Sequence, residues 1–456
     1  MVVVTCASEK EFLVVAIVEQ LAASLQELFT TVSDEAARAS ACVQRVRRLT
    51  GARLVQGLVF QWLASPQATV DELATALGIT PQAVQQRFTD RTADCLRRVL
   101  EAAVARGLAG RQVNVPLLRR FSGVYAEDGT TFALPAALAE LFPGCGGSRA
   151  PEASTAAVKM YLCYALASGA VQHLALVSGR TPDVAAAATV APALPAGALR
   201  IADLGFFDRA RLARDTAAGV YWLSRLPVGV TVATDTSSAQ EVSQFLAQQP
   251  AEVRVLDQQV RVGQAQQGKV PLPCRLLAFR CPPEVAARRR QKVKETARRK
   301  GRTVSARQLV LCDWVVLITN VPEELLSVAE AWELYRARWQ IEWLFKRWKG
   351  LGGLHLNLRW QPQRVLCEFY AKLLGMLVAQ WGTLIRGGPL EGVSLVRALR
   401  RVRQVLGRLA EALRRGESPQ AVLEELAGLL DRLPRQPRRR TRPSTRQRLF
   451  QPRLGA

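Results

Sequence analysis

The stretch Tyr335-Arg-Ala-Arg-Trp-Gln-Ile-Glu-Trp-Leu-Phe-Lys-Arg-Trp-Lys349 decides how this chain can fold and what it can bind. On an α-helix of about 100° per residue, four of its polar residues point into one arc of roughly 60°: Tyr335, Arg338, Glu342 and Lys349. The opposite arc is apolar and predicts a stripe that faces a core, made of Ile341, Leu344 and Trp348. One acid among cations indicates a metal ligand beside phosphate-binding groups. An exposed helix with surface ion pairs is the alternative.

The spacing of these four residues resembles a known signature, and that resemblance implies two further acids upstream. Y-x2-R-x3-E-x6-K resembles the signature of the IS4-type DDE transposases, the group that includes the Tn5 and Tn10 enzymes, at every defined position. Such enzymes use two aspartates before the glutamate, each at the end of a strand. Residues 122–128 predict a short strand that ends at Asp128, and residues 199–202 predict a second strand followed by Asp203. A lone Asp there is usually a turn former or helix cap, but three acids in this order fit the family.

The resemblance implies an RNase H-like catalytic core in which Asp128, Asp203 and Glu342 bind two Mg²⁺ or Mn²⁺ ions. Acids placed together need cations, because like charges raise one another's pKa. Two such ions activate the attacking oxygen and stabilise the leaving oxygen when a phosphodiester is cut and rejoined. The implied activity is that of an insertion-sequence transposase, which cuts transposon ends and pastes them into target DNA through a hairpin. Zinc is not indicated, because there is no Cys-x-x-Cys and His173 and His355 lie far apart.

The same resemblance assigns further residues to DNA. Tyr335, Arg338 and Lys349 would hold phosphates of the transposon end. Arg225 resembles the family's arginine on the strand after the second Asp and would contact the same DNA. Trp314 lies 21 residues before Tyr335, where a family tryptophan stacks on a flipped-out base. Such stacking contributes about 1–3 kcal/mol per base. The alternative for Trp314 is a core position on a buried strand.

The run Val70–Phe88 predicts a helix-turn-helix. An apolar-periodic helix ends at Gly78, and a second helix begins with Thr80 as N-cap and Pro81 as its first residue. The second helix would expose side chains suited to bases and phosphates, namely Gln82, Gln85, Gln86 and Arg87. A plain helical hairpin is the alternative, because the pattern is loose. The basic composition of the chain favours the DNA-binding interpretation.

The net charge of +24 indicates a polyanionic partner. The chain has 53 Arg but 9 Lys, a bias that GC-rich coding also produces. The charge is concentrated, since residues 284–307 carry ten cations against two anions and residues 432–456 carry nine against none. Four prolines accompany the second run, which predicts a disordered tail. The implied partner is double-stranded DNA, as terminal inverted repeats and target, and the resemblance implies a homodimer in the synaptic complex.

The expected fold class is α+β with several domains: an RNase H-like catalytic core, a β-rich insertion and helical regions at both ends. The expected divisions are a helical DNA-binding domain at 1–117, the core at 118–226 and 321–386, the insertion with a basic helix at 227–320, helices at 387–433 and the tail at 434–456. Nine scattered cysteines and the lack of an apolar run of about 18 residues predict a cytoplasmic protein without a membrane span. A non-catalytic or domesticated DNA-binding protein is the alternative function.

Overall fold

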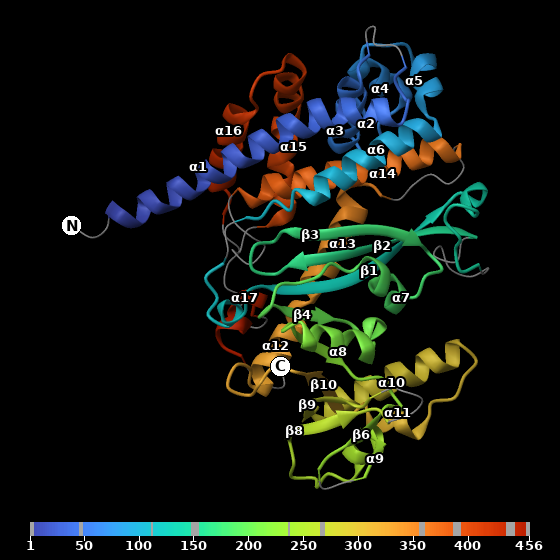
Figure 1. The fold of residues 1–456 in the computed structure, drawn as a ribbon, viewed down its shortest axis with the longest axis vertical. Helices are drawn as coiled ribbons and strands as arrows, with labels where there is room; N and C mark the ends of the chain where they lie inside the picture. Colours follow the sequence, from blue (N-terminus) through green and yellow to red (C-terminus); the bar gives the residue numbers. More distant parts are fainter. Residues whose placement is uncertain are drawn as a thin grey trace.

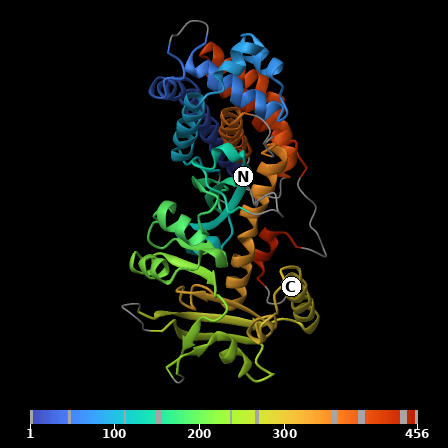
Figure 2. The same cartoon turned by 90° about the vertical axis from the view of Figure 1, so that its right-hand side faces the viewer.

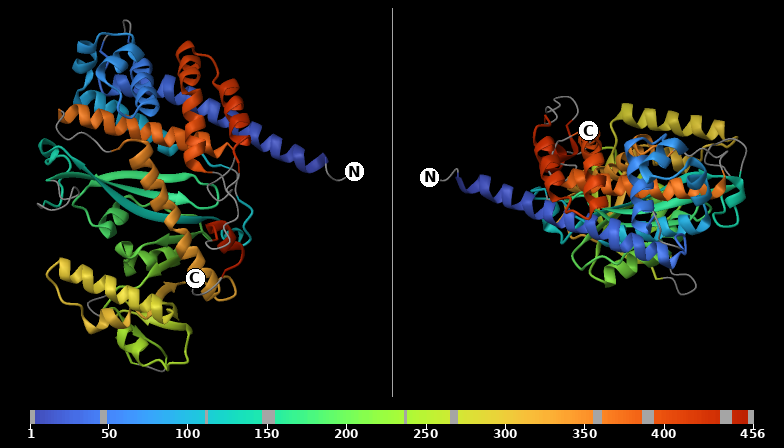
Figure 3. Two further views of the ribbon diagram at one scale, coloured as in Figure 1. Left: turned by 180° about the vertical axis from the view of Figure 1, so that it is seen from behind. Right: turned by 90° about the horizontal axis from the view of Figure 1, so that it is seen from above.

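The chain folds into a helical part and one large mixed sheet (Figure 1). The computed structural model describes residues 4–44, 49–110, 113–146, 155–235, 238–264, 270–354, 361–385, 394–434 and 443–452. Helices from both ends of the chain gather at one end of the molecule, and the sheet extends to the other end (Figure 2). The helix α13 (Trp339–Leu351) crosses a face of the sheet and connects the two parts (Figure 3).

The N-terminal part is helical, as the sequence predicts. Its elements are α1 (Val4–Glu27), a π-helical turn (Leu28–Val32), α2 (Ser33–Ala39), α3 (Gly51–Ala64), α4 (Val70–Leu77), α5 (Pro81–Arg87) and α6 (Asp90–Ala105). Thr69 and Glu72 form a capping box at the start of α4, which ends at Gly78 with a left-handed φ of 66°. Thr80 caps α5 through the backbone N–H of Ala83. These local signals produce the predicted pair of short helices joined by a tight turn.

The sheet has ten strands in the order β3-β2-β1-β4-β5-β10-β9-β8-β6-β7. They are β1 (Val124–Leu134), β2 (Ala156–Ala165), β3 (Val171–Ser178), β4 (Leu199–Ala202), β5 (Tyr221–Arg225), β6 (Thr231–Ala233), β7 (Gln240–Glu241), β8 (Val255–Val262), β9 (Leu272–Arg280) and β10 (Trp314–Thr319). The strands β1, β4 and β5 run parallel to one another, and all other neighbours pair antiparallel. The near-continuous apolar sequence of β2 matches its burial on both faces.

β1 is longer than the sequence predicts. A strand that ends at Asp128 is wrong, because residues 129–134 continue β1 and pair antiparallel with β2. The parallel pairing of β1 with the shorter β4 stops at Glu127. Asp128 therefore lies inside β1 but at the level where β4 ends, and Asp203 follows β4 directly at the start of a 3₁₀ turn. Asp128 and Asp203 lie at the same level of the sheet because β4 ends at that level. The end of β1 lies farther along, at Leu134.

The residues expected as an insertion, 227–320, extend the sheet that β1–β5 begin. β10 pairs with β5, and β9, β8 and β6 follow it outward. This region is not strand throughout, because Ser305 and Gln308 form the capping box of a short helix just before β10. The helical elements between the strands are η2 (Leu118–Arg120), η3 (Ala136–Leu138), α7 (Asp183–Val190), η4 (Leu204–Phe206), α8 (Arg209–Ala217), α9 (Val242–Ala247), α10 (Pro283–Arg299) and α11 (Ala306–Val310).

The C-terminal part is helical and folds back on both halves of the molecule. Its helices are α12 (Val328–Ala337), α13, α14 (Pro362–Leu384), α15 (Leu395–Arg415), α16 (Gln420–Asp431) and α17 (Thr445–Phe450). α14 is buried along most of its length, where it packs against α3, α6 and α15. The apolar stripe of α15 faces this same layer, so the first and last parts of the chain share one core.

A wholly disordered tail is wrong for the part of 434–456 that the structure describes. α17 packs on α12 and buries Leu449. The Gln340 amide donates a hydrogen bond to Thr445 at 2.8 Å, and Arg448 lies 3.4 Å from the buried Glu333. These apolar and ionic contacts with α12 and α13 offset the repulsion among the tail's cations. Residues 387–393, 435–442 and 453–456 lie outside the described residues.

Three apolar clusters pack on the sheet in the described part of the chain, and the smallest joins β2, α7 and the end of β4 around Tyr161 and Phe206. The largest joins the N-terminal helices, β1–β4, α12–α16 and α17. The second lies beneath β5, β6 and β8–β10 and contains the large side chains Trp222 and Trp314. None of the helices in the described ranges is long and apolar enough to cross a membrane.

Candidate active site

The polar stripe of residues 335–349 faces the sheet. The helix is divided at Arg338, which ends α12 and begins α13. Its φ and ψ of −49° and −32° are helical, so side chains on the two helices keep the common direction that a single helix predicts. The apolar arc is buried as expected, with no more than 1% exposure for Ile341, Leu344 and Trp348. The opposite arc of α13 therefore points away from that core.

Arg338 lies at the centre of the three predicted acids. Its Nη1 donates to Asp128 Oδ2 at 3.1 Å, and its Nη2 donates to Glu342 Oε1 at 2.9 Å. Asp203 Oδ2 lies 3.8 Å from the same Nη2. The phenol of Tyr335 donates to Asp203 Oδ1 at 2.8 Å. The Arg338 guanidinium thus lies within 4 Å of acids from β1, the end of β4 and α13.

The cation is sealed from solvent, whereas the acids are not. The Arg338 side chain is 5% exposed, against 18% for Asp128, 26% for Glu342 and 42% for Asp203. In this conformation Arg338 faces carboxylates, so a direct contact with a DNA phosphate requires its guanidinium to change partners. The accessible acids remain open to a further cation.

The pKa of Asp128 is raised to about 6, and the first cause is burial of its carboxyl group. Arg338 and the backbone N–H of Gly129, which donates to Oδ1 at 2.8 Å, act in the opposite direction. The negative charges of Glu342 and Asp203 raise the pKa further. A carboxylate in such surroundings is stabilised by any additional cation.

The pKa of Asp203 is shifted in the opposite direction from that of Asp128. Burial acts to raise its pKa, but the charge of Arg338 and the backbone N–H of Leu204 outweigh it, and the pKa is lowered. The Tyr335 phenol and the charge of Arg225 act in the same direction. Arg225 is the last residue of β5 and is partly exposed. It therefore lies near enough to the acids to influence them and keeps access to solvent.

Lys349 lies farther along α13, against the continuing part of β1. Its Nζ donates to the carbonyl oxygen of Thr131 at 3.2 Å and lies 4.9 Å from the centre of the Phe132 ring. The side chain is partly exposed. The predicted stripe is thus split: Tyr335 and Arg338 contact the acids, and Lys349 sits beside them on β1.

The donor set suits a hard divalent cation. Carboxylate oxygens are the ligands that Mg²⁺ and Mn²⁺ prefer, and three carboxylates surround the Arg338 guanidinium. In the part of the chain that the structure describes, no three acidic, histidine or cysteine side chains lie close enough together to hold one metal ion. At this site the Arg338 guanidinium lies between the acids, 2.9 to 3.8 Å from an oxygen of each. His173 lies on β3, and His355 is outside the described residues.

A buried ion network lies directly behind the acids. Glu127 has no exposed surface, and both Arg200 and Arg211 donate to its carboxylate, Arg211 at 2.7 Å. Arg200 also binds Asp215 at 2.8 Å. Sequence reasoning missed this network because its members look like ordinary polar positions. The sequence did contain a signal: Glu127 and Arg200 are charged residues within the largely apolar strands β1 and β4. A charged residue in such a strand needs a buried partner.

A fourth acid, Asp183 at the start of α7, packs against the residues that follow two of the predicted acids. Lys159 Nζ holds its Oδ1 at 2.7 Å. A Cβ added at Gly205 would lie 2.7 Å from Asp183 Oδ2, and one at Gly129 would lie 3.3 Å from Oδ1. Glycine at these two positions leaves room for the Asp183–Lys159 pair.

Gly205→Ala is expected to lower the melting temperature, because its methyl group displaces the Asp183 carboxylate from Lys159. Because Gly205 is exposed and the contact is with the end of a partly exposed side chain, the loss should be that of a weakened surface ion pair, about 0.2–1 kcal/mol. Thermal unfolding of purified protein measures the effect. Gly407→Ala is the control, since its Cβ would meet nothing within 4 Å. The control should be neutral or slightly stabilising. Equal melting temperatures for Gly205→Ala and the parent would contradict the packing described.

Trp314 occupies a core position, the alternative that the sequence left open. It begins β10, is 2% exposed and packs with Trp222 and Ile318. The Arg280 guanidinium lies 4.3 Å from its ring centre and is held by the carbonyl oxygens of residues 249, 250 and 253. Stacking of Trp314 on a flipped base is wrong for this conformation, because neighbouring side chains cover the ring.

The predicted DNA-facing residues of the helix-turn-helix lie on α5. Gln82, Gln85 and Gln86 are exposed, while Val84 is buried against the other helices. Arg87 differs, because it is partly buried and donates to the carbonyl oxygen of Cys42 at 3.3 Å. The three glutamines thus form the accessible polar face of α5, and Arg87 helps to fix the loop beside it.

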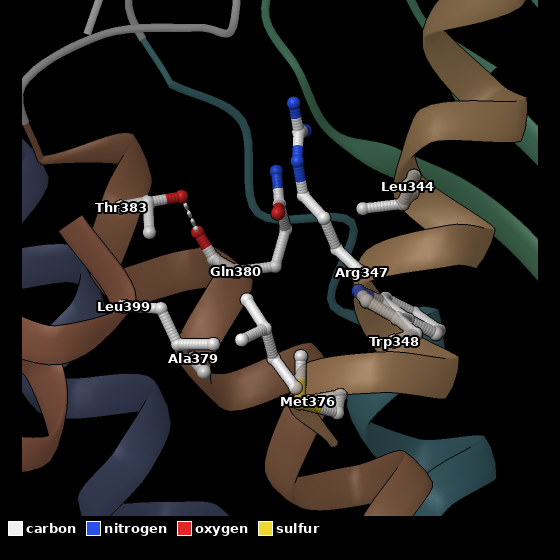
Figure 4. Close-up of a pocket in the computed structure, with 9 residues that line it drawn as sticks. Leu344, Arg347, Trp348, Met376, Ala379, Gln380, Thr383 and Leu399 are labelled. Carbon is white, nitrogen blue, oxygen red and sulfur yellow. Dashed lines mark hydrogen bonds between the residues drawn. The ribbon is translucent and has the colours of Figure 1, made fainter. Parts of the chain in front are cut away.

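A small cavity lies on the far side of α13 from these acids, between α13, α14 and α15 (Figure 4). Leu344 and Trp348 line it together with Arg347, Gln380 and Thr383. Its volume of about 20 Å³ is room for one water molecule. None of the three predicted acids lines it, so the candidate site is the partly exposed carboxylate cluster.

A comparison with known protein families matches this chain over the elements that carry the cluster. The family described as "Transposase DDE domain" covers residues 119–376, which include β1, β4 and α13. The chain belongs to this family of DDE transposases. Membership of the family implies that the protein depends on a divalent metal ion and acts on DNA.

Individual transposases resemble the chain over most of its length. The transposase for insertion sequence element IS231F of Bacillus thuringiensis subsp. israelensis is 27% identical over 394 residues, 80% of each chain. The transposase for IS231B of Bacillus thuringiensis subsp. berliner is 26% identical over 366 residues, 76% of this chain and 75% of its own. The transposase for IS1151 of Clostridium perfringens is 24% identical over 311 residues, 65% of each chain. These relatives agree with an IS4-type DDE transposase.

Proposed function

We propose that Asp128, Asp203 and Glu342 are the metal-binding acids with which this insertion-sequence transposase cleaves DNA at the ends of its element and joins them to target DNA. Their convergence on Arg338 supports the assignment. The acids come from three elements far apart in the sequence, and a surface ion pair between neighbouring helix residues would require only one of them.

The residues around the cluster have separate tasks. Asp128, Asp203 and Glu342 would hold two Mg²⁺ or Mn²⁺ ions, which activate the attacking oxygen and stabilise the leaving oxygen. Arg338 keeps the three carboxylates together, and Tyr335 orients Asp203 through its hydrogen bond. Lys349 and Arg225, both partly exposed at the edges of the cluster, would neutralise phosphates of the bound strand.

The proposed core is RNase H-like. Its support is the order β3-β2-β1-β4-β5 with β1, β4 and β5 parallel. We assign residues 118–226 and 321–386 to this core, 227–320 to an insertion that extends its sheet, and 387–433 to an added helical region. Cutting would follow the cut-and-paste route through a hairpin.

The DNA-binding domain would be residues 1–117, with α5 presenting Gln82, Gln85 and Gln86 to the terminal inverted repeats. Their exposure on one short helix after a tight turn supports this role. A homodimer would hold two element ends in the synaptic complex. The DNA-binding role of residues 1–117 and the homodimer can each be tested without the cleavage chemistry at the three acids.

A cleavage assay on the element's own terminal inverted repeats tests the proposed function. We expect nicking at the repeat end in the presence of Mg²⁺ or Mn²⁺, and none after chelation with EDTA. Retained DNA binding without any metal-dependent cleavage would favour the alternative of a non-catalytic DNA-binding protein. Metal-independent cleavage would remove the three acids from the mechanism.

Lys349 and Arg338 are expected to respond differently to salt. Lys349→Ala should weaken binding to the terminal repeat and reduce the slope of log K against log salt by about 0.9, the value for one lost phosphate contact. Arg338→Ala should leave the slope unchanged and impair cleavage, because Arg338 is bonded to carboxylates. Binding titrations over a range of salt concentrations measure both slopes.

Arg254→Ala, at an exposed cation just before β8, is the control for general loss of charge. Its slope should match that of the parent protein. A reduced slope for Arg338→Ala would mean that the guanidinium exchanges carboxylates for a phosphate when DNA binds.

A further inference from the structure

Four charged side chains make up the buried Glu127 network behind the acids: Glu127, Arg200, Arg211 and Asp215. Glu127 directly precedes Asp128 in β1, and Arg200 lies in β4, three residues before Asp203. Arg211 lies in α8, the first α-helix after Asp203. The network therefore connects the two strands and the helix that adjoin these aspartates.

Arg200 lies at the centre of the network. Its Nη1 donates to Glu127, and its Nε and Nη2 donate to Asp215 at 2.8 and 3.3 Å. Arg211 Nη2 donates to both carboxylate oxygens of Glu127, at 2.9 and 2.7 Å. Glu127 has no exposed surface, and the two arginine side chains are 5% and 8% exposed. Bulk water therefore does not replace a hydrogen bond that is lost here.

The network is better suited to fix positions than to raise stability. Moving a charged group out of water costs free energy that its partner often only just recovers, and a well-packed apolar set of the same volume is often as stable. A buried ion pair does fix geometry, because a guanidinium donates its hydrogen bonds in set directions. The hydrogen bonds of Arg200 thus hold β1, β4 and α8 in one arrangement.

The backbone pairing between β1 and β4 does not reach the aspartates. It runs from Val124 and Leu199 to Glu127 and Ala202, and the next residue on each strand is an acid. Two metal ions about 3.5–4 Å apart need ligands at a fixed separation. The Glu127 network adds side-chain contacts at this level. It lies on the face covered by α8, seen in Figure 1, whereas α13 crosses the opposite face, seen in Figure 3.

We propose that Arg200 and Arg211, acting through Glu127, are positioning residues that set the separation between Asp128 and Asp203 for metal binding. The proposal rests on the proposed function, in which these two aspartates are metal ligands. Both arginines bond to Glu127 on the face away from Arg338, so they act on the aspartates through β1, β4 and α8. Changes to residues that orient metal ligands weaken metal affinity by about 10- to 100-fold.

Binding of Mn²⁺ to the whole chain, followed by electron paramagnetic resonance, tests the proposal without cleavage. Arg200→Lys keeps the charge but loses the fork that joins Glu127 to Asp215. It should raise the Mn²⁺ dissociation constant by about 10-fold, the lower end of the range for residues that orient ligands. The Mg²⁺ concentration for half-maximal cleavage should rise by the same factor. Binding of the terminal repeat in EDTA should not change.

Arg275→Lys is the matched control, because Arg275 is also a strand arginine, 3% exposed and forked on an aspartate through Nε and Nη2. That aspartate is Asp257 in β8, on the part of the sheet away from the acids. Arg200→Lys and Arg275→Lys should both lower the melting temperature, but only Arg200→Lys should weaken Mn²⁺ binding. Asp215→Asn removes the outer partner of Arg200 and should weaken Mn²⁺ binding in the same direction, which provides the test if Arg200→Lys does not fold.

Two outcomes would overturn the positioning role. One is an unchanged Mn²⁺ dissociation constant in Arg200→Lys and Asp215→Asn. The other is an equal rise in Arg275→Lys, because a general loss of stability would then account for the effect.

Asp128→Asn and Asp203→Asn, measured in the same Mn²⁺ assay, show which proposal has failed. If these two variants weaken Mn²⁺ binding and the network variants do not, the positioning role alone is wrong. If neither set weakens it, the aspartates are not metal ligands, and both the proposed function and the positioning role are wrong.

Discussion

Asp128→Asn, Asp203→Asn and Glu342→Gln are each expected to abolish strand cleavage while leaving binding to the element's end largely intact. A lost metal ligand removes several kcal/mol of transition-state stabilisation, which is at least about 10³-fold in rate. DNA affinity rests mainly on phosphate neutralisation, to which the acids do not contribute. Gel shift and cleavage on the same substrate measure the two effects separately.

The amide variants keep the shape of each side chain and one oxygen toward Arg338, so the cluster should remain folded. Asp235→Asn is the control, because Asp235 is 84% exposed and pairs only with Arg261 in the described structure. It should cleave at the parent rate. Any one of the three variants that still cleaves in Mg²⁺ would lose its place among the metal-binding acids, without affecting the assignment of the other two.

Trp314→Ala is expected to lose every function together, because the side chain fills the second core. Truncation of a buried tryptophan destabilises by about 3–5 kcal/mol. It also removes the ring beneath the Arg280 guanidinium and leaves that cation without its apolar contact. Thermal or urea unfolding measures the loss, and DNA binding and cleavage should fall in proportion to the folded fraction.

Trp343→Ala is the matched control for this experiment, since the same substitution is made at a ring that is 50% exposed. Its melting temperature should stay close to that of the parent. A Trp314→Ala protein with an unchanged melting temperature and a selective defect in hairpin formation would revive the base-stacking role that the sequence allowed.

The helices of this protein could be predicted from sequence because their signals are local. The capping box of α4, Gly78 and Thr80 specify the short helix pair without reference to other parts of the chain. The arc that contains Tyr335, Arg338 and Glu342 likewise follows from helical periodicity, even though the helix is divided at Arg338. The order of Asp128, Asp203 and Glu342 along the chain required the resemblance to a family as well.

The features that could not be predicted from the sequence depend on contacts between segments that are far apart along the chain. The continuation of β1 past Asp128 depends on its partner β2, which no local pattern reveals. Burial of Trp314 depends on the neighbours that fold over β10, and the ordering of α17 depends on the face of α12. The central position of Arg338 was also missed, because i,i+4 spacing predicts its pair with Glu342 but not its contacts with Asp128 in β1 and Asp203 after β4.

Neighbouring acids in β1 serve opposite sides of the sheet. Glu127 points to the buried arginines of β4 and α8, and Asp128 points to Arg338, as the alternation of a strand requires. Deleting one residue between 124 and 126 would move Asp128 to the place of Glu127 and Gly129 to the place of Asp128, so that the buried arginines would meet a shorter acid and Arg338 would lose its acid from β1. β1 should therefore tolerate substitutions far better than insertions or deletions of a single residue. The spacing from residue 124 to 128 is thus under stronger constraint than the identity of the apolar side chains within it.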